Sequence, residues 1–354
     1  MSRFFSSRYE SLEPYTPGEQ PKNLSEVIKL NTNESPYPPL KEAMEYGFNT
    51  ARPLNLYSDP ECVELRTEMA KKYGIKPSQV VAVNGSDEIL NFSFMAFCDD
   101  RNTAAFPDIT YGFYKVFADF NHVRYEEIPL DKDFKVDFRD YLGINKTIFI
   151  ANPNAPTGLT ISLSEIEEIL KSNPDNVVII DEAYVDFGGE SAVKLIDTYK
   201  NLLVTQTFSK SRSMAGGRLG FGFACEELIS DINRIRFSTN PYNVNAMTMA
   251  VGVGTLKNDD YYMEKCREIA ATRDYTREEL IKMGFSVIPS KANFIFAETD
   301  RIDGEVLYNR LRERNILTRH FKNERIRNFV RISIGTKEQM ARFLLAVKEI
   351  LEEK

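Results

Sequence analysis

The chain has 354 residues, of which 42% are hydrophobic and 27% charged, and its formal net charge is -7 at pH 7. This length exceeds what one hydrophobic core usually serves, and the composition excludes a disordered or fibrous chain. The acidic balance argues against a nucleic-acid-binding protein, which would show clustered Lys and Arg.

The first ten residues, MSRFFSSRYE, lack the apolar run of a secretory signal, and no later stretch is long enough to span a bilayer. We therefore expect a cytoplasmic protein that does not bind membranes. The cysteines lie far apart and form no CxxC pair, so neither a zinc site nor a disulfide framework is expected. The four residues expected to be reduced thiols are Cys62, Cys98, Cys225 and Cys266.

Between residues 80 and 224, short β-branched runs alternate with segments of helical periodicity, which is typical of a mostly parallel α/β sheet flanked by helices. One crossover helix is predicted to begin at Ser164, which can form a capping box with Glu167 ahead of a single apolar face. The runs predicted as strands are Val80–Val83, Thr147–Ala151, Val177–Asp181, Leu202–Thr205 and Leu219–Ala224.

The last third of the chain has shorter strand patterns and ends in an amphipathic helix that begins near Thr336. It predicts a smaller α+β domain, joined to the larger one by a long helix over 258–283. The short strands are expected at 286–289, 293–297 and 329–334. The expected division is a large domain over 30–257 and a small domain made of 1–29 and 258–354.

Ligands of open α/β sheets bind beyond the carboxyl ends of the strands, so polar residues that follow each predicted strand are candidate site residues. The first group is Asn84–Glu88, where the start of a helix offers backbone amides to a phosphate, although an ordinary capped turn explains the same residues. The second is Asn152–Gly158, with the sequence NPNAPTG. It is either a proline-rich loop or a rigid source of amide donors.

Asp181 directly follows the apolar run 177–180, and Tyr184 comes three residues later. A carboxylate at the end of a buried strand is costly unless a group such as a protonated ring nitrogen pairs with it. The alternative role for Asp181 is a helix N-cap.

The fourth group, Thr207–Arg218, places Lys210 among hydroxyls and glycines. A solvated lysine is the simplest interpretation. A lysine can form a Schiff base with an aldehyde cofactor if its amine is partly neutral, which burial and nearby cations favour. Arg212 and Arg218 are the candidate cations.

The chain resembles the fold-type I pyridoxal-phosphate-dependent aminotransferases in the order of three motifs. These are NPxxPTG, Asp-x-x-Tyr and Ser-Lys with a downstream arginine. Over nearly the whole chain, the resemblance is greatest to the histidinol-phosphate aminotransferases. The segments that carry it are LEPYTPG at 12–18, LNTNESPYP at 30–38, LYSDP at 56–60, NPYNVN at 240–245 and VRISIG at 330–335.

The resemblance implies pyridoxal 5'-phosphate as the cofactor. Lys210 would form the Schiff base and move the proton, and Asp181 would pair with the pyridinium nitrogen. Asn154 and Tyr184 would bind the phenolic oxygen, and Tyr111 would stack on the ring. The groups implied to hold the phosphate are Gly85, Ser86, Asp87, Thr207, Ser209, Arg218 and the partner subunit's Tyr57, which implies a homodimer.

The same resemblance implies a substrate site. Arg331 would bind the carboxylate of glutamate or 2-oxoglutarate, for which a bidentate guanidinium is suited. Arg319 and Tyr15 would bind the phosphate of histidinol phosphate. The implied reaction converts histidinol phosphate and 2-oxoglutarate into imidazole acetol phosphate and glutamate, in histidine biosynthesis. Two departures from the family pattern are Ala155, in place of the second Asn of NPNNPTG, and Gly217 before Arg218.

Aromatic amino-acid aminotransferases and threonine-phosphate decarboxylases share most of these motifs, and both stay open as alternatives. An NAD-dependent dehydrogenase is disfavoured because no GxGxxG follows an early strand. A non-catalytic regulator is disfavoured because the chain has no spare length for a DNA-binding module. The two histidines, His122 and His320, form no metal-binding pattern, so no metal is expected.

Overall fold

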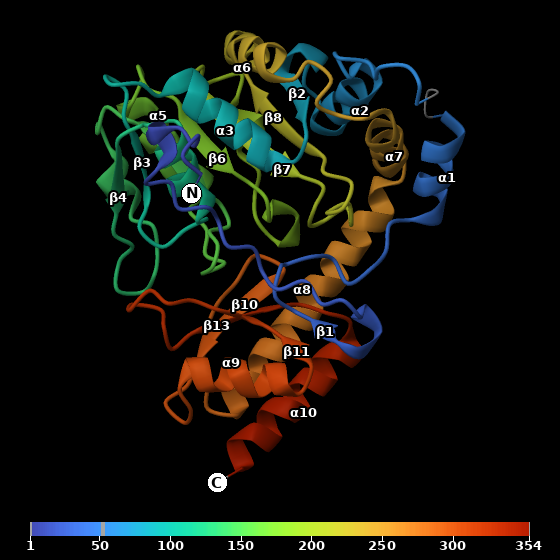
Figure 1. The fold of residues 1–354 in the computed structure, drawn as a ribbon, viewed down its shortest axis with the longest axis vertical. Coiled ribbons are helices and arrows are strands. Elements are labelled where there is room, and N and C mark those ends of the chain that lie inside the picture. The colour runs from blue at the N-terminus through green and yellow to red at the C-terminus, as the bar shows by residue number, and fades with distance from the viewer. Residues whose placement is uncertain (1, 51–53, 354) are drawn as a thin grey trace.

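The computed structural model describes residues 2–50 and 54–353. In Figure 1 an upper part is built on a seven-stranded sheet and a lower part on a four-stranded sheet, and the long helix α8 (Asp259–Lys282) runs from one to the other. This arrangement confirms the predicted α/β class with a large, mostly parallel sheet and a smaller α+β part. No described helix has both the length and the apolar character needed to cross a membrane.

The large sheet is parallel except at β8, which pairs antiparallel with both of its neighbours. Apart from the edge strand β4, its strands are buried on both faces and are therefore nearly continuous apolar runs. Each predicted strand is confirmed to within two residues at either end. The strand order is β2 (Val80–Val83), β8 (Gly220–Ala224), β7 (Leu202–Thr207), β6 (Val178–Asp181), β5 (Thr147–Ala151), β3 (Ala104–Pro107) and β4 (Tyr125–Ile128).

The sequence pattern missed two strands, β3 and β4. The sequence of β3 is AAFP, and neither alanine nor proline favours a strand on its own, so the tertiary context decides. β4 lies at the edge of the sheet, and its central residues Glu126 and Glu127 are exposed, so the strand has no apolar run to reveal it.

Helices cover both faces of the large sheet, and alternate residues of one strand face opposite helix layers. Val80 and Ala82 of β2 belong to one core cluster, whereas Val81 and Val83 belong to the other. The first layer contains α2 (Val63–Tyr73), α5 (Leu163–Ser172) and α7 (Ala246–Lys257), on which α1 (Lys41–Thr50) packs. The second contains α3 (Ser86–Phe97), α4 (Phe113–Phe120) and α6 (Glu226–Thr239).

The predicted start of helix α5 was two residues late. Ser162, not Ser164, is the N-cap, and its capping box closes with Glu165. The segment offers two overlapping Ser-x-x-Glu pairs, and the helix uses the earlier one. The apolar face is as predicted, because Ile166 and its neighbours one turn on are buried in the core.

In the lower part, the short sheet packs with α8, α9 (Gly304–Glu313) and α10 (Lys337–Glu352). The N-terminal segment joins this part, because β1 (Ile28–Lys29) pairs with β11 (Ile316–Leu317). The sheet order is β12 (Arg319–His320), β13 (Val330–Ser333), β10 (Phe294–Glu298) and β9 (Ser286–Ile288). We propose the domain division 30–257 against 1–29 with 258–354, because each sheet then lies within one domain.

A buried ion-pair network connects the loop after β7 to helix α8. The guanidinium of Arg212, only 3% exposed, pairs with Asp186 in the loop after β6 and with Asp259 at 2.9 Å, in the first turn of α8. Ser211 also donates its hydroxyl to Asp186, at 2.7 Å. The loop that carries Lys210 is therefore fixed relative to the helix that joins the two parts.

Replacing Arg212 with Met leaves Asp186 and Asp259 without their shared cation. Removing one partner of a buried ion pair typically costs about 3 to 5 kcal/mol. We therefore expect the free energy of unfolding, measured by urea denaturation, to fall by about 3 kcal/mol because both carboxylates are partly reached by water.

The matched control is Arg234→Met on the exposed side of α6. It should change the free energy of unfolding by less than about 0.5 kcal/mol. A similarly small loss for Arg212→Met would mean that the network does not hold the loop in place.

Candidate active site

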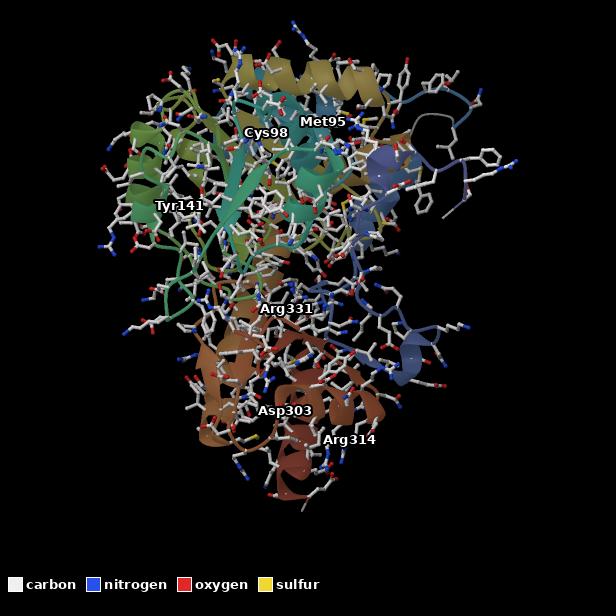
Figure 2. The ribbon with its side chains drawn as sticks, turned by 60° about the vertical axis from the view of Figure 1, so that its left-hand side comes forward. Met95, Cys98, Tyr141, Asp303, Arg314 and Arg331 are labelled. Carbon is white, nitrogen blue, oxygen red and sulfur yellow. The ribbon has the colours of Figure 1, made fainter. Side chains whose placement is uncertain are left out.

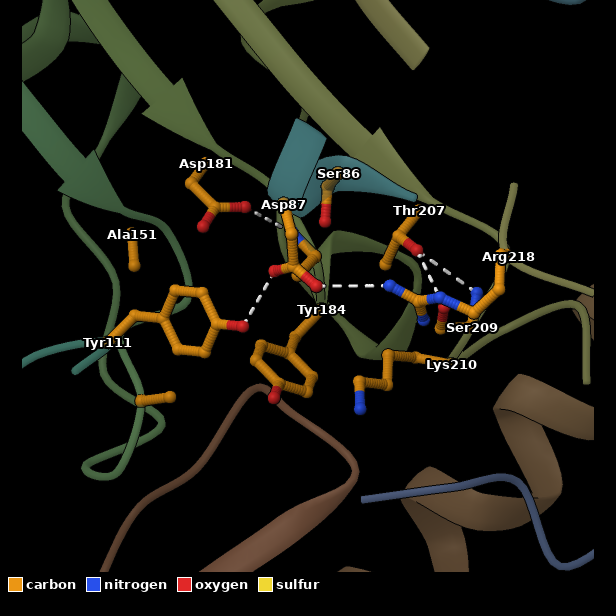
Figure 3. A pocket seen from close by; sticks show the side chains of 12 residues that line it. Ser86, Asp87, Tyr111, Ala151, Asp181, Tyr184, Thr207, Ser209, Lys210 and Arg218 are labelled. Atoms are coloured by element: carbon orange, nitrogen blue, oxygen red, sulfur yellow. Dashed lines mark hydrogen bonds and ion pairs between the residues drawn. The ribbon is translucent and has the colours of Figure 1, made fainter. Parts of the chain in front are cut away.

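A cavity of about 560 Å³, here called the inner cavity, lies at the carboxyl ends of β5, β6 and β7 and beside the start of α3 (Figure 3). This is the edge of the sheet at which ligands were expected. The predicted cofactor residues that the structure brings together in its wall are Ser86, Asp87, Tyr111, Asp181, Tyr184, Thr207, Ser209, Lys210 and Arg218.

Lys210 extends from the loop after β7, and its Nζ donates a hydrogen bond to the backbone oxygen of Thr32 at 3.0 Å. Burial of the amine, and after it the positive charge of Arg331, lower the pKa of Lys210 to about 8. The expectation that Arg212 supplies a nearby cation was wrong, because its guanidinium points to two carboxylates instead. Arg218 does contribute, with a smaller effect than Arg331.

Asp181 ends β6 and is 4% exposed. Burial raises the pKa of its carboxyl to about 6, and hydrogen bonds work against that rise. Tyr114 donates its hydroxyl at 2.9 Å, and Thr205 and the amide of Ala183 each donate at 3.2 Å. The carboxylate is therefore mostly ionised at neutral pH and held in one orientation, as a partner for a cationic ring nitrogen should be.

Tyr114 was not predicted as a site residue. It lies on α4 three residues after Tyr111, and its side chain is fully buried. The apolar pattern of α4 predicts a core position there, and only the tertiary structure shows that its hydroxyl reaches Asp181.

The start of α3 forms an anion cradle. Gly85 has a φ of +81°, and a Cβ on it would lie 2.6 Å from Nη2 of Arg218, so the close approach of this guanidinium requires glycine. Arg218 also pairs with Asp87 at 3.0 Å, and Asp87 accepts a hydrogen bond from Tyr111, as Figure 3 shows. The other donors nearby are the hydroxyls of Thr207 and Ser209 and the helix amides of Ser86 and Asp87.

Asn154 is not in the wall of the inner cavity, contrary to its expected role. It is 2% exposed, and its Nδ2 donates to the backbone oxygen of Ile109 at 3.0 Å, while its Oδ1 accepts from Thr110 at 2.7 Å. Ala155 takes the place in the wall instead. The side chains of Asn154 and Ala155 thus face different surroundings, and the motif alone does not tell which of the two faces the cavity.

A second and wider cavity of about 1050 Å³, the outer cavity, adjoins the first and shares Lys210 and Tyr184 with it. All three predicted substrate residues line it. Tyr15 stacks on Phe113 with ring centroids 4.3 Å apart, while Arg319 and Arg331 come from neighbouring strands.

Arg319 and Arg331 are direct cross-strand partners in β12 and β13. Like charges opposite each other destabilise a sheet, so this pair indicates a site for anions. Arg331 lies at the junction of the two parts (Figure 2) and donates from Nη2 to the backbone oxygen of Asn31 at 3.0 Å. Its buried Nε has no hydrogen-bond partner among the described residues. An anionic ligand would satisfy that donor.

Tyr57 lies outside both cavities of its own chain. Its side chain is 77% exposed and stacks on Tyr242, with ring centroids 4.4 Å apart. The predicted contact of this residue with the site of a second subunit stays a prediction.

Comparison with known proteins assigns this geometry to a family. The family model described as aminotransferase class I and II matches residues 25–347. The chain is 49% identical to the histidinol-phosphate aminotransferase of Clostridium acetobutylicum, over 99% of this chain and 100% of that protein. It is 46% identical to the histidinol-phosphate aminotransferase of Brachyspira hyodysenteriae, again over 99% and 100%.

A solved structure shares the fold at lower identity. The histidinol-phosphate aminotransferase of Sinorhizobium meliloti in complex with pyridoxal-5'-phosphate superimposes with a TM-score of 0.89 and 19% identity. The match covers 99% of this chain and 98% of that one. At this level of identity the similarity concerns the fold.

The depressed pKa of Lys210 can be tested by its reactivity, since only the neutral amine is nucleophilic. The rate at which fluorodinitrobenzene modifies Lys210, followed by peptide mapping, should reach half of its maximum near pH 8. In Arg331→Gln this midpoint should rise, because a positive charge that disfavours the ammonium form is lost.

Free Nα-acetyl-lysine gives the unperturbed reference, and Arg139→Gln, an exposed arginine, is the matched control and should leave the midpoint unchanged. An unchanged midpoint in Arg331→Gln would show that the charge of Arg331 does not act on the amine.

Proposed function

The chain belongs to the class I and II aminotransferases, and on that premise we propose that it transfers the amino group of histidinol phosphate to 2-oxoglutarate. The products are imidazole acetol phosphate and glutamate, and the reaction is a step of histidine biosynthesis. The cofactor is pyridoxal 5'-phosphate. The observation that carries the proposal is the cross-strand pair Arg319 and Arg331, which lines a cavity shared with Lys210.

The inner cavity fits the cofactor. The cradle at the start of α3 supplies a guanidinium, hydroxyls and helix amides to a phosphate. Asp181 would hold the proton on the ring nitrogen, Tyr111 would stack on the ring, and Lys210 would form the covalent link. When bound, pyridoxal phosphate supplies an electron sink for the charge that develops at the substrate carbon.

Lys210 performs the proton transfer. Because burial brings its pKa to about 8, its amine is neutral in a useful fraction at neutral pH and can accept the proton from the α-carbon of the substrate. The ammonium so formed has the backbone oxygen of Thr32 within hydrogen-bond distance, at 3.0 Å. In the donor half-reaction this ammonium would pass the proton on to the cofactor, and in the acceptor half-reaction the same group would deliver a proton to the α-carbon of the keto acid.

The outer cavity accommodates both substrates in turn. Arg331 offers its unpartnered Nε to the α-carboxylate of glutamate or 2-oxoglutarate. Arg319 and Tyr15 bind the phosphate of histidinol phosphate, which carries no carboxylate. Aromatic amino-acid aminotransferase and threonine-phosphate decarboxylase, the two alternatives within this fold, are not favoured, because the relatives at 49% and 46% identity are histidinol-phosphate aminotransferases.

We also propose that the protein is a cytoplasmic homodimer. Several large apolar side chains around the end of α1 and the start of α2 are exposed, and such a patch indicates a protein interface. In the proposed dimer a second copy binds this patch, and the partner subunit's Tyr57 contributes to the phosphate cradle. The exposed residues are Phe48 at 70%, Leu54 at 74%, Leu56 at 60%, Tyr57 at 77% and Val63 at 58%.

A single-turnover spectrum of the pyridoxal-loaded protein tests the proposed function. The protein is mixed separately with histidinol phosphate, phenylalanine, tyrosine and threonine phosphate, and loss of the visible cofactor band is followed. Histidinol phosphate should convert the cofactor fastest. Preference for an aromatic amino acid would assign the chain to the aromatic aminotransferases, and no conversion with any donor would refute the proposal. Lys210→Ala should show none.

Arg319→Met tests the assignment of the phosphate site. Loss of a charge-assisted contact should raise the KM for histidinol phosphate by about 10- to 100-fold. The kcat/KM for phenylalanine, which has no phosphate, should change by less than about threefold by the same reasoning. Arg101→Met, an exposed arginine, is the control. An equal fall in kcat/KM for histidinol phosphate and for phenylalanine would show that Arg319 does not bind the phosphate.

A further inference from the structure

Residues 31–33, here called the strap, pass between the two parts of the molecule and contact both Lys210 and Arg331. They follow β1, which pairs in the lower part, and lead toward α1 in the upper part. The backbone oxygen of Asn31 accepts from Arg331, and that of Thr32 accepts from Lys210, each at 3.0 Å. A change in the strap can therefore alter the positions of both Lys210 and Arg331.

Asn33 has a partner for every one of its polar groups. Its backbone amide donates to the hydroxyl of Ser333 at 2.9 Å, and that hydroxyl donates back to Oδ1 at 2.8 Å. Its backbone oxygen accepts from Asn293 at 2.9 Å, and its Nδ2 donates to the hydroxyl of Tyr184 at 3.0 Å. The residue is 1% exposed. Ser333 thus fixes the orientation of the amide that contacts Tyr184.

The hydrogen bond from Asn33 determines where Tyr184 can donate. The ring of Tyr184 is 8% exposed and packs edge-on against Phe294, with ring centroids 5.1 Å apart, so the ring itself is held. Burial raises the pKa of Tyr184, so the phenol keeps its proton at neutral pH. Because its oxygen already accepts from Asn33, its own hydrogen is free to point into the inner cavity, where Lys210 also lies.

We propose that Asn33 is a positioning residue, which directs the hydroxyl of Tyr184 to donate into the cofactor cavity and links it through Ser333 to the strand that carries Arg331. The inference rests on the proposed function, since it takes the acceptor to be the phenolic oxygen of pyridoxal phosphate. With Ala155 in the cavity wall and Asn154 turned to the loop at 109–110, Tyr184 is the donor on this side of the cavity.

The left-handed backbone of Asn33, with a φ of +56°, suggests the variant that separates positioning from folding. Both Asn and Asp tolerate this conformation. Asn33→Asp keeps the acceptor for Ser333 but replaces the donor with a second acceptor, which should draw the hydrogen of Tyr184 away from the cavity. If Asn33→Asp changed only the stability of the left-handed backbone, the direction of the Tyr184 hydroxyl would stay the same.

The experiment uses the purified full chain with pyridoxal phosphate and has two readouts besides turnover. They are the dissociation constant of pyridoxal phosphate and the pH midpoint of the visible band of the bound cofactor. Asn33→Asp should weaken cofactor binding by about tenfold, the size expected for one buried hydrogen bond, and should shift the pH midpoint. Tyr184→Phe should shift it in the same direction.

A double-mutant cycle decides whether Asn33 acts through Tyr184. In the Tyr184→Phe background, Asn33→Asp should change cofactor binding by less than about twofold. Full additivity of the two changes would overturn the proposal. Asn315→Asp is the matched control, because Asn315 also has a left-handed backbone, with a φ of +59°, but lines neither cavity.

Two further outcomes are decisive. If Asn33→Asp does not fold, Ser333→Ala takes its place, and it must reproduce the shift in pH midpoint because it frees the amide of Asn33. An unchanged midpoint in that variant would overturn the proposal. If the wild-type chain does not bind pyridoxal phosphate, the proposed function itself fails. If the wild type binds it and the strap variants bind it equally well, only the role of Asn33 fails.

Discussion

The candidate site depends above all on the burial of ionisable side chains at the carboxyl edge of the seven-stranded sheet. Asp181, Lys210 and Arg331 meet there, and burial raises the pKa of Asp181 and lowers that of Lys210, so that it favours the neutral form of each. Asp181 stays mostly ionised because three donors hold it, whereas Lys210 lies next to a second cation and is shifted toward its neutral form. The fold therefore supplies opposite environments to two groups that belong to one site.

The features predicted from the sequence are those that depend on local patterns. Apolar runs located the strands, and the polar residue after each run located Asp181 and the loop of Lys210 at the correct edge of the sheet. The two failures at the site have a common cause, which is side-chain direction. Asn154 and Arg212 lie in motifs that were correctly placed, yet both side chains turn toward the protein instead of the cavity. Strand β4 was missed because an exposed edge strand needs no apolar run.

Residues far apart in the sequence complete the site, and no local pattern could pair them. Tyr114 reaches Asp181 across 67 positions, and Asn33 reaches Ser333 across 300. The two parts of the molecule also meet outside the site, where Arg325 binds Asp108 at 2.6 Å. Next to that ion pair, a small apolar cluster combines residues of both parts. The strap, helix α8 and this contact together determine how the arginines of the lower part face the lysine of the upper part.

The pairing of β1 with β11 has a consequence for folding during synthesis on the ribosome. Of the described strands, Ile28–Lys29 is made first, and its partner Ile316–Leu317 is among the last. The seven-stranded sheet, whose strands lie between residues 80 and 224, can form as soon as that stretch has emerged, because domains generally fold as units during synthesis. Strand β1 must stay unpaired until Ile316–Leu317 has been synthesised. Because this strand is only two residues long, its unpaired backbone groups are a poor template for aggregation.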